Sequence, residues 1–296
     1  MGSFLTPAVS PARRLRELLA GPEPVLAPGA YDALSARLVE QAGFPAVYMT
    51  GFGAAASVLG RPDVGLVSGT EMADHARRLA RAVGIPLIAD ADTGYGNPLN
   101  VIRTVQEYAA AGVAALHLED QVAPKKCGHM TGKQVVPPEE MVQKIRAAVA
   151  ARGAGDLVII ARTDARAVEG LDAALERARR YRDAGADVLF VEAPESEGEI
   201  ERIARTLEGV PLLFNWVESG RTPPVPLSRL REYGFKLVIF PVTTLFAATF
   251  AVRAALERLK ADGTPVALAD RQVSFPEFLD LIGLDEIRTL EARFAT

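Results

Sequence analysis

One short segment, Lys125-Lys126-Cys127-Gly128-His129, places the only cysteine of the chain among two lysines and a histidine. A free thiol has a pKa of about 8.5, and cationic neighbours lower it by stabilising the thiolate. The segment therefore predicts that Cys127 titrates near neutral pH and delivers or accepts a proton during a reaction. The alternative is that both lysines are solvated loop charges and Cys127 is an ordinary small residue.

Polar side chains also follow several short apolar runs. If these runs are parallel strands of one barrel, their carboxyl ends share one rim, where barrel enzymes have their active sites. The candidate positions are Thr50-Gly51-Phe52, Asp90, Asp92, Glu119, Arg162, Glu192 and Asn215. Taken singly, a strand-end carboxylate also fits a turn, a helix cap or a surface ion pair. Several of them at one rim favour a functional site.

The carboxylates of this group outnumber its cations. Asp90, Asp92, Glu119 and Glu192 in one cavity repel one another unless a cation is bound or some are protonated. An oxygen-rich set without cysteine or histidine at metal-binding spacing favours Mg2+ or Mn2+ over zinc. Asp90 and Asp92 share a face only if the strand continues through both, so one is expected to bind through water. His117 is interpreted as a packing residue of the barrel.

The elements that must position these residues are eight continuously apolar runs, each followed by a longer amphipathic segment. Continuous apolarity is typical of strands covered on both faces. The runs are Val25–Ala27, Val47–Thr50, Leu87–Ala89, Ala115–Leu118, Val158–Ala161, Val188–Val191, Leu212–Phe214 and Leu237–Phe240. The intervening segments carry helix signals, such as the start at Pro137–Glu140 and the stop at Gly153. His75 lies on a polar helical segment and is expected to be exposed.

Eight strand–helix units in roughly 240 residues predict a (β/α)8 barrel of the TIM type, with a doubly wound sheet as the alternative. No linker or composition break divides the chain, so residues 1–296 are interpreted as a single domain. Residues 263–296 form a C-terminal helical extension. Its apolar side chains predict that it packs on this subunit or on a neighbouring one.

The composition excludes several classes of function. The 296 residues are 49% apolar and 24% charged, as in ordinary globular proteins. The net charge is −4 and the basic residues are scattered, so no nucleic-acid partner is expected. A single cysteine fits a reducing compartment, and a cytoplasmic location is expected. The longest uncharged run, Leu237–Val252, is too short and too polar to span a membrane.

These motifs resemble the isocitrate lyase/phosphoenolpyruvate mutase superfamily, specifically its short branch of methylisocitrate and 2,3-dimethylmalate lyases. The resemblance extends from Pro24 to Leu259, and the Lys125–His129 string is its most diagnostic part. The other matching motifs are Thr50-Gly51, Leu59–Asp63, Asp90–Asp92, Gly94–Gly96, Leu118–Gln121, Ala161–Asp164 and Glu192-Ala193. The resemblance implies Mg2+-dependent cleavage of a 2-hydroxy di- or tricarboxylic acid. The products are pyruvate or a related 2-oxo acid and a second carboxylic acid.

The resemblance also implies roles for individual residues. Asp90 would hold the metal, with Asp63, Asp92 and Glu119 acting partly through bound waters. Glu119 is counted among the catalytic residues as well. Cleavage leaves an enediolate on the second fragment, and Cys127, carried on a mobile segment that closes over the site and excludes water, would protonate it.

Further residues complete this implied site. His129 and Lys125 would tune the thiol, and Arg162 would bind substrate oxygens as a charged fork. The other implied substrate contacts are Thr50, Gly51, Phe52, Glu192 and Asn215. In this superfamily the last helical region typically swaps between subunits of a homotetramer, and the apolar extension is compatible with that arrangement.

The eighth strand–helix unit bears on the substrate. Methylisocitrate lyases carry an arginine for an additional carboxylate at the position of Phe246. The resemblance therefore implies a smaller or more apolar acid, such as a substituted malate. The alternatives are a phosphonomutase, against which Cys127 argues, a hydrolase of oxaloacetate-like acids, and a non-catalytic barrel that keeps the metal cluster.

Overall fold

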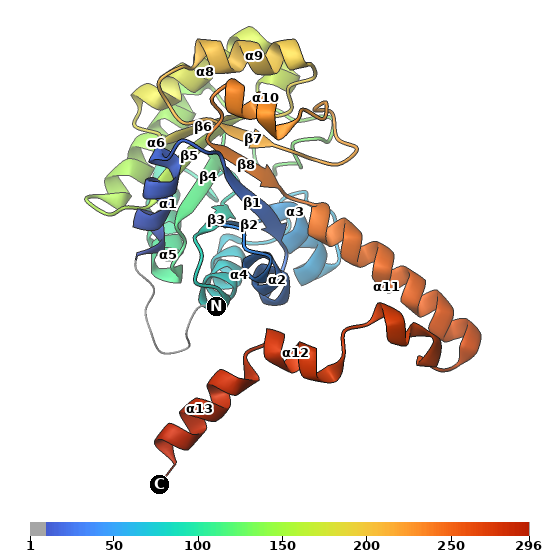
Figure 1. Cartoon of the computed structure of the whole chain (residues 1–296). Coiled ribbons are helices and arrows are strands. Elements are labelled where there is room, and N and C mark those ends of the chain that lie inside the picture. The colour runs from blue at the N-terminus through green and yellow to red at the C-terminus, as the bar shows by residue number, and fades with distance from the viewer. Residues whose placement is uncertain (1–9, 296) are drawn as a thin grey trace.

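The computed structural model describes residues 10–295 and contains eight parallel strands surrounded by helices (Figure 1). All eight apolar runs form strands; two have the predicted ends, and the ends of the other six differ by up to three residues. The strands are β1 (Val25–Ala30), β2 (Val47–Met49), β3 (Leu87–Asp90), β4 (Ala115–Glu119), β5 (Val158–Thr163), β6 (Val188–Val191), β7 (Leu213–Asn215) and β8 (Leu237–Phe240).

The strands follow the order β6-β5-β4-β3-β2-β1-β8-β7, with every neighbouring pair parallel. A parallel bridge between Leu189 and Leu212 brings β6 to the start of β7. The Leu189 N–H also donates to the Pro211 carbonyl at 3.0 Å. The sheet is therefore a nearly closed barrel, which confirms the TIM-type prediction and excludes the open doubly wound sheet.

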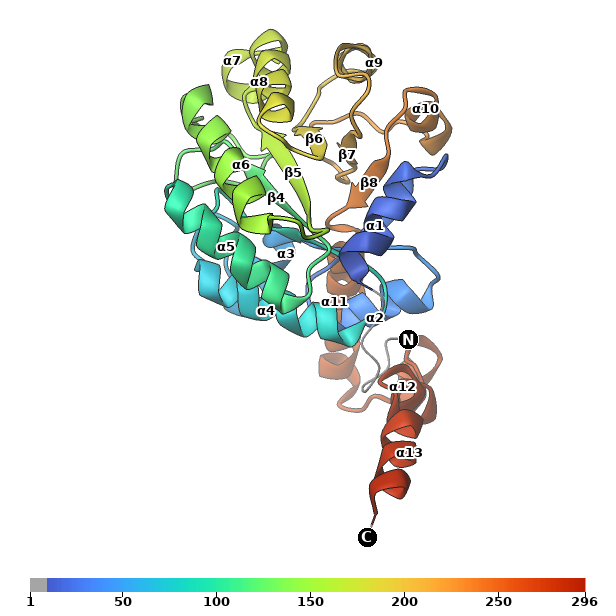
Figure 2. The same ribbon diagram turned by 90° about the vertical axis from the view of Figure 1, so that its left-hand side faces the viewer.

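Helices follow the strands and cover the barrel (Figure 2). They are α1 (Pro11–Ala20), α2 (Ala33–Gln41), α3 (Gly51–Ala54), the π-helical turn η1 (Ala55–Leu59), α4 (Gly69–Ala82), α5 (Pro98–Ala111), α6 (Pro138–Arg152), α7 (Arg166–Glu169), α8 (Leu171–Asp183), α9 (Glu197–Thr206), α10 (Leu227–Glu232), α11 (Thr243–Asp262), the 3-10 turn η2 (Val266–Arg271), α12 (Phe275–Leu281) and α13 (Leu284–Phe294). The predicted start and stop of α6 are confirmed, with Pro138 in its first turn and Gly153 as its C-cap.

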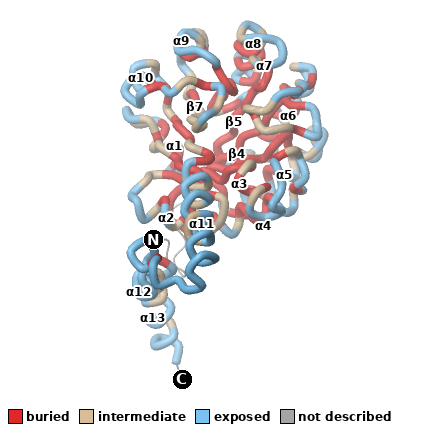
Figure 3. Tube along the Cα trace, turned by 90° about the vertical axis from the view of Figure 1, so that its right-hand side faces the viewer, coloured by how far each residue is buried: buried red, intermediate tan, exposed pale blue. Residues whose placement is uncertain are grey.

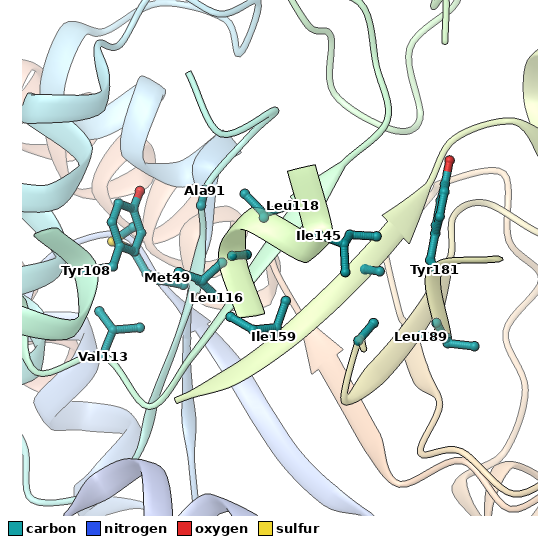
Figure 4. Close-up of a cluster of buried hydrophobic side chains, with 14 of the residues drawn as sticks. Met49, Ala91, Tyr108, Val113, Leu116, Leu118, Ile145, Ile159, Tyr181 and Leu189 are labelled. Carbon is teal, nitrogen blue, oxygen red and sulfur yellow. The ribbon is translucent and has the colours of Figure 1, made fainter. Parts of the chain in front are cut away.

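The core has two parts because successive strand residues face opposite sides of the sheet. Leu116 and Leu118 of β4 face the helices and join a large cluster with Ile145 of α6 and Ile159 of β5 (Figure 4). Ala115 belongs to a second cluster inside the barrel. His117 and Glu119 share the inward parity of Ala115, so the strand that builds the core also delivers two polar groups to the barrel axis.

The C-terminal extension projects away from the barrel (Figures 1 and 3). It returns to the barrel at α2, where Arg37 Nε donates to the Leu281 carbonyl at 2.8 Å. Large apolar side chains nevertheless stay exposed, including Phe275 and Phe294. The extension therefore packs little on its own subunit, and the alternative, packing on a neighbouring subunit, stays a prediction. In the described part of the chain, the helices lack the length and apolarity needed to cross a membrane.

Candidate active site

A cavity of about 220 Å³ opens at the carboxyl ends of the strands. Two larger hollows lie elsewhere, one beside α9 and α10 and one between α11 and η2, away from the strand ends. Most residues predicted for the site line this cavity: Thr50, Phe52, Asp63, Asp90, Lys125, Cys127, His129, Arg162, Glu192, Asn215 and Phe246. Gly51, Asp92 and Glu119 lie directly behind the lining, each against one of these residues.

The strongest candidate for a metal centre lies where β3 and β4 end. Oxygen or nitrogen atoms of Asp90, His117 and Glu119 lie within 4.8 Å of one another. Both carboxylate oxygens of Glu119 are buried without a hydrogen-bond partner among the described residues. Burying two such oxygens without a hydrogen bond is costly. Arg162 Nη1, 3.3 Å from Oε2, relieves that cost in part, and a bound cation would relieve it further. The donor set therefore fits a divalent ion.

His117 lies fully inside the barrel, as expected for a packing residue, but it also touches the acidic cluster. Its ring stacks on Tyr48, whose hydroxyl is 2.8 Å from Nε2. The same nitrogen is 3.6 Å from Asp90 Oδ1. Burial lowers the pKa of His117 to about 4, although Asp90 opposes that shift, so the ring is neutral at pH 7.

Asp63 and Asp92 form a separate group with Lys125. The Lys125 ammonium is 2.7 Å from an oxygen of each carboxylate. Asp92 has φ +47°, so the strand ends at Asp90 and does not continue through both aspartates. The Asp92 N–H instead donates to Asp90 Oδ1 at 2.9 Å. The four predicted metal residues are thus brought near each other, with a lysine seated between two of them.

Arg162 is held by carboxylates on three sides. Its Nε donates to Asp164 Oδ2 at 2.9 Å, and its Nη1 is 3.3 Å from Glu119 Oε2, opposite it in the β4–β5 register. Glu192 lies 3.9 Å from Nε. Burial raises the pKa of Glu192, but Arg162 and His129 outweigh that effect and lower it overall. Burial keeps the pKa of Glu119 well above its usual range.

The predicted reactive string belongs to a loop that we call the gate (residues 121–136), which lies over the cavity. Its two ends meet in an antiparallel bridge between Gln121 and Val135. The Cys127 N–H donates to the Asp63 carbonyl at 3.2 Å. A β-carbon at Gly128 would overlap Glu192 and Arg162. Only glycine therefore lets the gate approach the barrel this closely.

The environment of the Cys127 thiol differs from the prediction. Burial raises its pKa to about 11, and the N–H of His129 offsets this only in part. The prediction of a thiol that titrates near neutrality was wrong because the thiol is buried and the Asp63 and Glu192 carboxylates raise its pKa further. The neighbouring basic groups are also already paired. Lys125 is occupied by two aspartates, and His129 lies 3.1 Å from Glu192. The thiol is thus protonated at pH 7, which suits a proton donor.

One wall of the cavity is apolar. The Phe52 ring at the start of α3 meets the Phe246 ring of α11 edge to face, with 6.5 Å between centroids. Met130, Val217 and Val242 line the same cavity. A site without a charged partner on this wall suits an alkyl substituent rather than another carboxylate.

Some residues escaped the sequence analysis. Tyr48 was hidden in an apolar strand, where the inward parity it shares with Ala46 was the available signal. Lys133 has a 2% exposed side chain and its Nζ lies 2.7 Å from Asp164 Oδ1, a pairing that nothing in the local sequence announces. His75, expected to be exposed, is buried at 6% exposure.

Comparisons with known proteins agree over nearly the whole chain. The family described as phosphoenolpyruvate phosphomutase matches residues 15–260. A 2,3-dimethylmalate lyase of Eubacterium barkeri is 50% identical over 96% of this chain and 98% of its own. A 2-methylisocitrate lyase of Aeropyrum pernix is 45% identical over 98% and 92%. A solved oxaloacetate acetylhydrolase with 3,3-difluorooxalacetate is 40% identical at a TM-score of 0.92, covering 99% of this chain and 98% of that one.

Proposed function

The chain belongs to the phosphoenolpyruvate mutase/isocitrate lyase superfamily, and on that basis we propose that it is a Mg2+-dependent carbon–carbon lyase acting on a 2-hydroxydicarboxylic acid. One observation carries the proposal. The Cys127 thiol, the Asp90 carboxylate and the Arg162 guanidinium line one cavity of about 220 Å³. Such a cavity combines a proton donor, a metal-binding carboxylate and a fixed cation for substrate oxygens.

Asp90 would hold the metal directly, with Asp63, Asp92 and Glu119 contributing partly through water. The Glu119 oxygens, which are buried and accept no hydrogen bond among the described residues, support this assignment. Mg2+, with Mn2+ as the alternative, is proposed ahead of zinc because the set is dominated by oxygen donors. When bound, the ion would supply Lewis-acid stabilisation to the substrate carboxylate and its 2-oxygen.

The residues of the chain account for the rest of the reaction. The 2-hydroxyl loses its proton to the acidic cluster around Glu119, the C2–C3 bond breaks, and C2 becomes the 2-oxo carbon. The electron pair of that bond forms an enediolate on the second fragment, and Cys127 Sγ–H donates a proton to C3. Arg162 binds substrate oxygens through N–H groups that Asp164 orients. His129 and Lys125 position the gate that carries the thiol.

The remaining predicted contacts define the shape of the substrate. Thr50, Gly51 and Phe52 lie at the first turn of α3, where hydroxyl or backbone donors would bind the carboxylate next to C2. Glu192 and Asn215 form the opposite wall, joined by two 3.2 Å hydrogen bonds.

The apolar wall favours one substrate class. Phe52 and Phe246 pack edge to face on this wall, so an additional carboxylate placed against it would meet two aromatic rings instead of a cation. We therefore propose a malate that carries alkyl groups, such as 2,3-dimethylmalate, in preference to a tricarboxylic acid. Cleavage of the C2–C3 bond of 2,3-dimethylmalate would give pyruvate and propanoate.

Hydrolysis of oxaloacetate is the second candidate, because the solved oxaloacetate acetylhydrolase shares 40% identity and a TM-score of 0.92 with this chain. The experiment incubates the protein with Mg2+ and a panel of 2-hydroxy acids while coupled pyruvate formation is recorded. A parallel sample with oxaloacetate is assayed for oxalate. Pyruvate from an alkylated malate supports the lyase, oxalate from oxaloacetate supports the hydrolase, and neither product contradicts both.

The proposal includes the setting of the enzyme. A cytoplasmic location keeps the single thiol reduced. A homotetramer would cover the apolar side chains of α11, α12 and α13, which are exposed in one chain.

A further inference from the structure

Lys133 lies behind the cavity lining, near the end of the gate, and the proposed reaction assigns it no role. We propose that Lys133 is a positioning residue that holds the gate down over the cavity by pairing with Asp164. The consequence for turnover rests on the proposed function. The consequence for the position of the gate does not.

The contacts of Lys133 join the gate to the barrel next to Cys127. Its Nζ is 2.7 Å from Asp164 Oδ1, at the end of β5. The same ammonium donates to the carbonyl of Gly128, the residue directly after Cys127. One buried cation thus connects the middle of the gate to a carboxylate of the barrel.

Asp164 also orients the substrate-binding cation. Its Oδ1, which accepts from Lys133, also accepts from Arg162 Nη2 at 3.1 Å, and its Oδ2 accepts from Arg162 Nε at 2.9 Å. The Asp164 N–H donates to Asp120 Oδ1 at 2.8 Å, and Asp120 in turn accepts from Tyr181 at 2.8 Å. Asp164 is therefore held in one position by its neighbours. The gate and the Arg162 fork are positioned against the same carboxylate.

Lys125 and His129 also attach the gate to the barrel, but their partners belong to the proposed active site. Lys125 and His129 pair with carboxylates of the site itself, so their replacement would disturb the chemistry directly. Lys133 contacts Asp164 and the gate backbone alone in the hydrogen bonds found within residues 10–295. Its replacement leaves Asp164 paired with Arg162, so the hydrogen bonds that orient the Arg162 guanidinium are kept.

The chain contains its own reporter for the position of the gate. Cys127 is the only cysteine, so alkylation by N-ethylmaleimide reports access to one thiol in the gate. The test variant is Lys133→Met, which keeps an unbranched side chain of similar length and removes the charge. The matched control is Lys126→Met, because the Lys126 ammonium donates to the Gly132 carbonyl at 2.8 Å within the gate and makes no hydrogen bond to the barrel among residues 10–295. Thermal melting verifies that each variant is folded.

We expect Cys127 in the Lys133→Met variant to be alkylated at least about 10-fold faster than in the wild type. A charge-assisted hydrogen bond that is lost should raise the equilibrium constant for opening of the gate by at least about 10-fold. Lys126→Met should stay within about 2-fold, since exposed pairs contribute little. The increase should be uniform across a series of pH values, because a change in thiol pKa would move the midpoint instead. A folded Lys133→Met protein that alkylates at the wild-type rate overturns the proposal.

Lys133→Arg supplies a second arm, since it keeps the cation and should restore slow alkylation at least in part. With an alkylated malate as substrate, Lys133→Met should lower kcat more than it raises KM, because Lys133 does not line the cavity. If the wild type cleaves none of the 2-hydroxy acids, the lyase proposal fails while the alkylation result still decides the role of Lys133. If Cys127 is alkylated as fast in Lys133→Arg as in Lys133→Met, the positive charge at residue 133 does not hold the gate, and the proposal is contradicted.

Discussion

Gly51 lies so close to the Asp90 carboxylate that a β-carbon at residue 51 would overlap Asp90 Oδ2. Asp90 is buried, and its Oδ1 already accepts the Asp92 N–H. The carboxylate therefore has little room to retreat. The absence of a side chain at residue 51 is a condition for the present position of the proposed metal-binding carboxylate.

Gly51→Ala should consequently weaken metal binding without unfolding the barrel. We expect the Mg2+ concentration for half-maximal activity to rise by about 10- to 100-fold, the usual cost of disturbing a group that orients a metal ligand. Titration calorimetry with Mg2+ measures the same change without substrate. The control is Gly198→Ala in the exposed first turn of α9, where a β-carbon meets nothing closer than 3.9 Å. Unchanged Mg2+ affinity in Gly51→Ala would contradict this account of Asp90.

Cys127→Ser tests the proton donor. A hydroxyl fits the same space but is a far weaker acid than the thiol, so kcat should fall by about 10²- to 10⁴-fold. Mg2+ affinity should stay at the wild-type value, because the thiol is not among the carboxylates that would hold the ion. A near-wild-type kcat would refute the role of Cys127, and lost Mg2+ affinity would show that the substitution disturbed the site more broadly.

Phe246→Arg tests the substrate class. An arginine on the apolar wall would pair with an additional carboxylate, so the ratio of kcat/KM for 2-methylisocitrate to that for 2,3-dimethylmalate should rise by about 10- to 100-fold. Ala247→Arg adds the same charge at the next residue of α11, which does not line the cavity. A ratio that moves equally in both variants, or in neither, would show that Phe246 does not select the substrate.

Removal of residues 263–296 tests the assembly. Phe275 is 76% exposed and Phe294 is 65% exposed in one chain, so a partner subunit is expected to cover them. Light scattering coupled to gel filtration should give a tetramer for the full chain and a smaller species for the shortened one. A monomeric full chain would contradict the expected homotetramer.

Much of the fold is predictable because parallel strands covered on both faces are continuous apolar runs. The predicted Val188–Val191 and Leu237–Phe240 coincide with β6 and β8. The packing of the C-terminal extension is harder to predict. Its apolar side chains indicate that its surface is covered, but they do not indicate which subunit covers it. The helical turn at Gly51 was missed as well, since it directly continues the β2 run.

The sequence predicts which residues belong to the site, but it does not predict which of them form ion pairs with one another. Strand ends identify Asp90, Glu119 and Arg162 as neighbours, because parallel strands end at one rim. The raised pKa of Cys127 depends instead on its burial and on the Asp63 and Glu192 carboxylates, which lie far from it in the sequence. Asp63 is also the partner of Lys125, 62 residues away. Local sequence shows the cation beside the thiol but not the carboxylate that neutralises it.

The most direct test of the proposed mechanism is cleavage of 2,3-dimethylmalate by the Mg2+-loaded protein in D2O, followed by NMR. The account predicts equal amounts of pyruvate and propanoate, with one deuterium on C2 of propanoate where the thiol delivers it. Omission of Mg2+ should abolish both products. A protein that forms no 2-oxo acid under these conditions, or that forms it equally well without a divalent ion, would contradict the account.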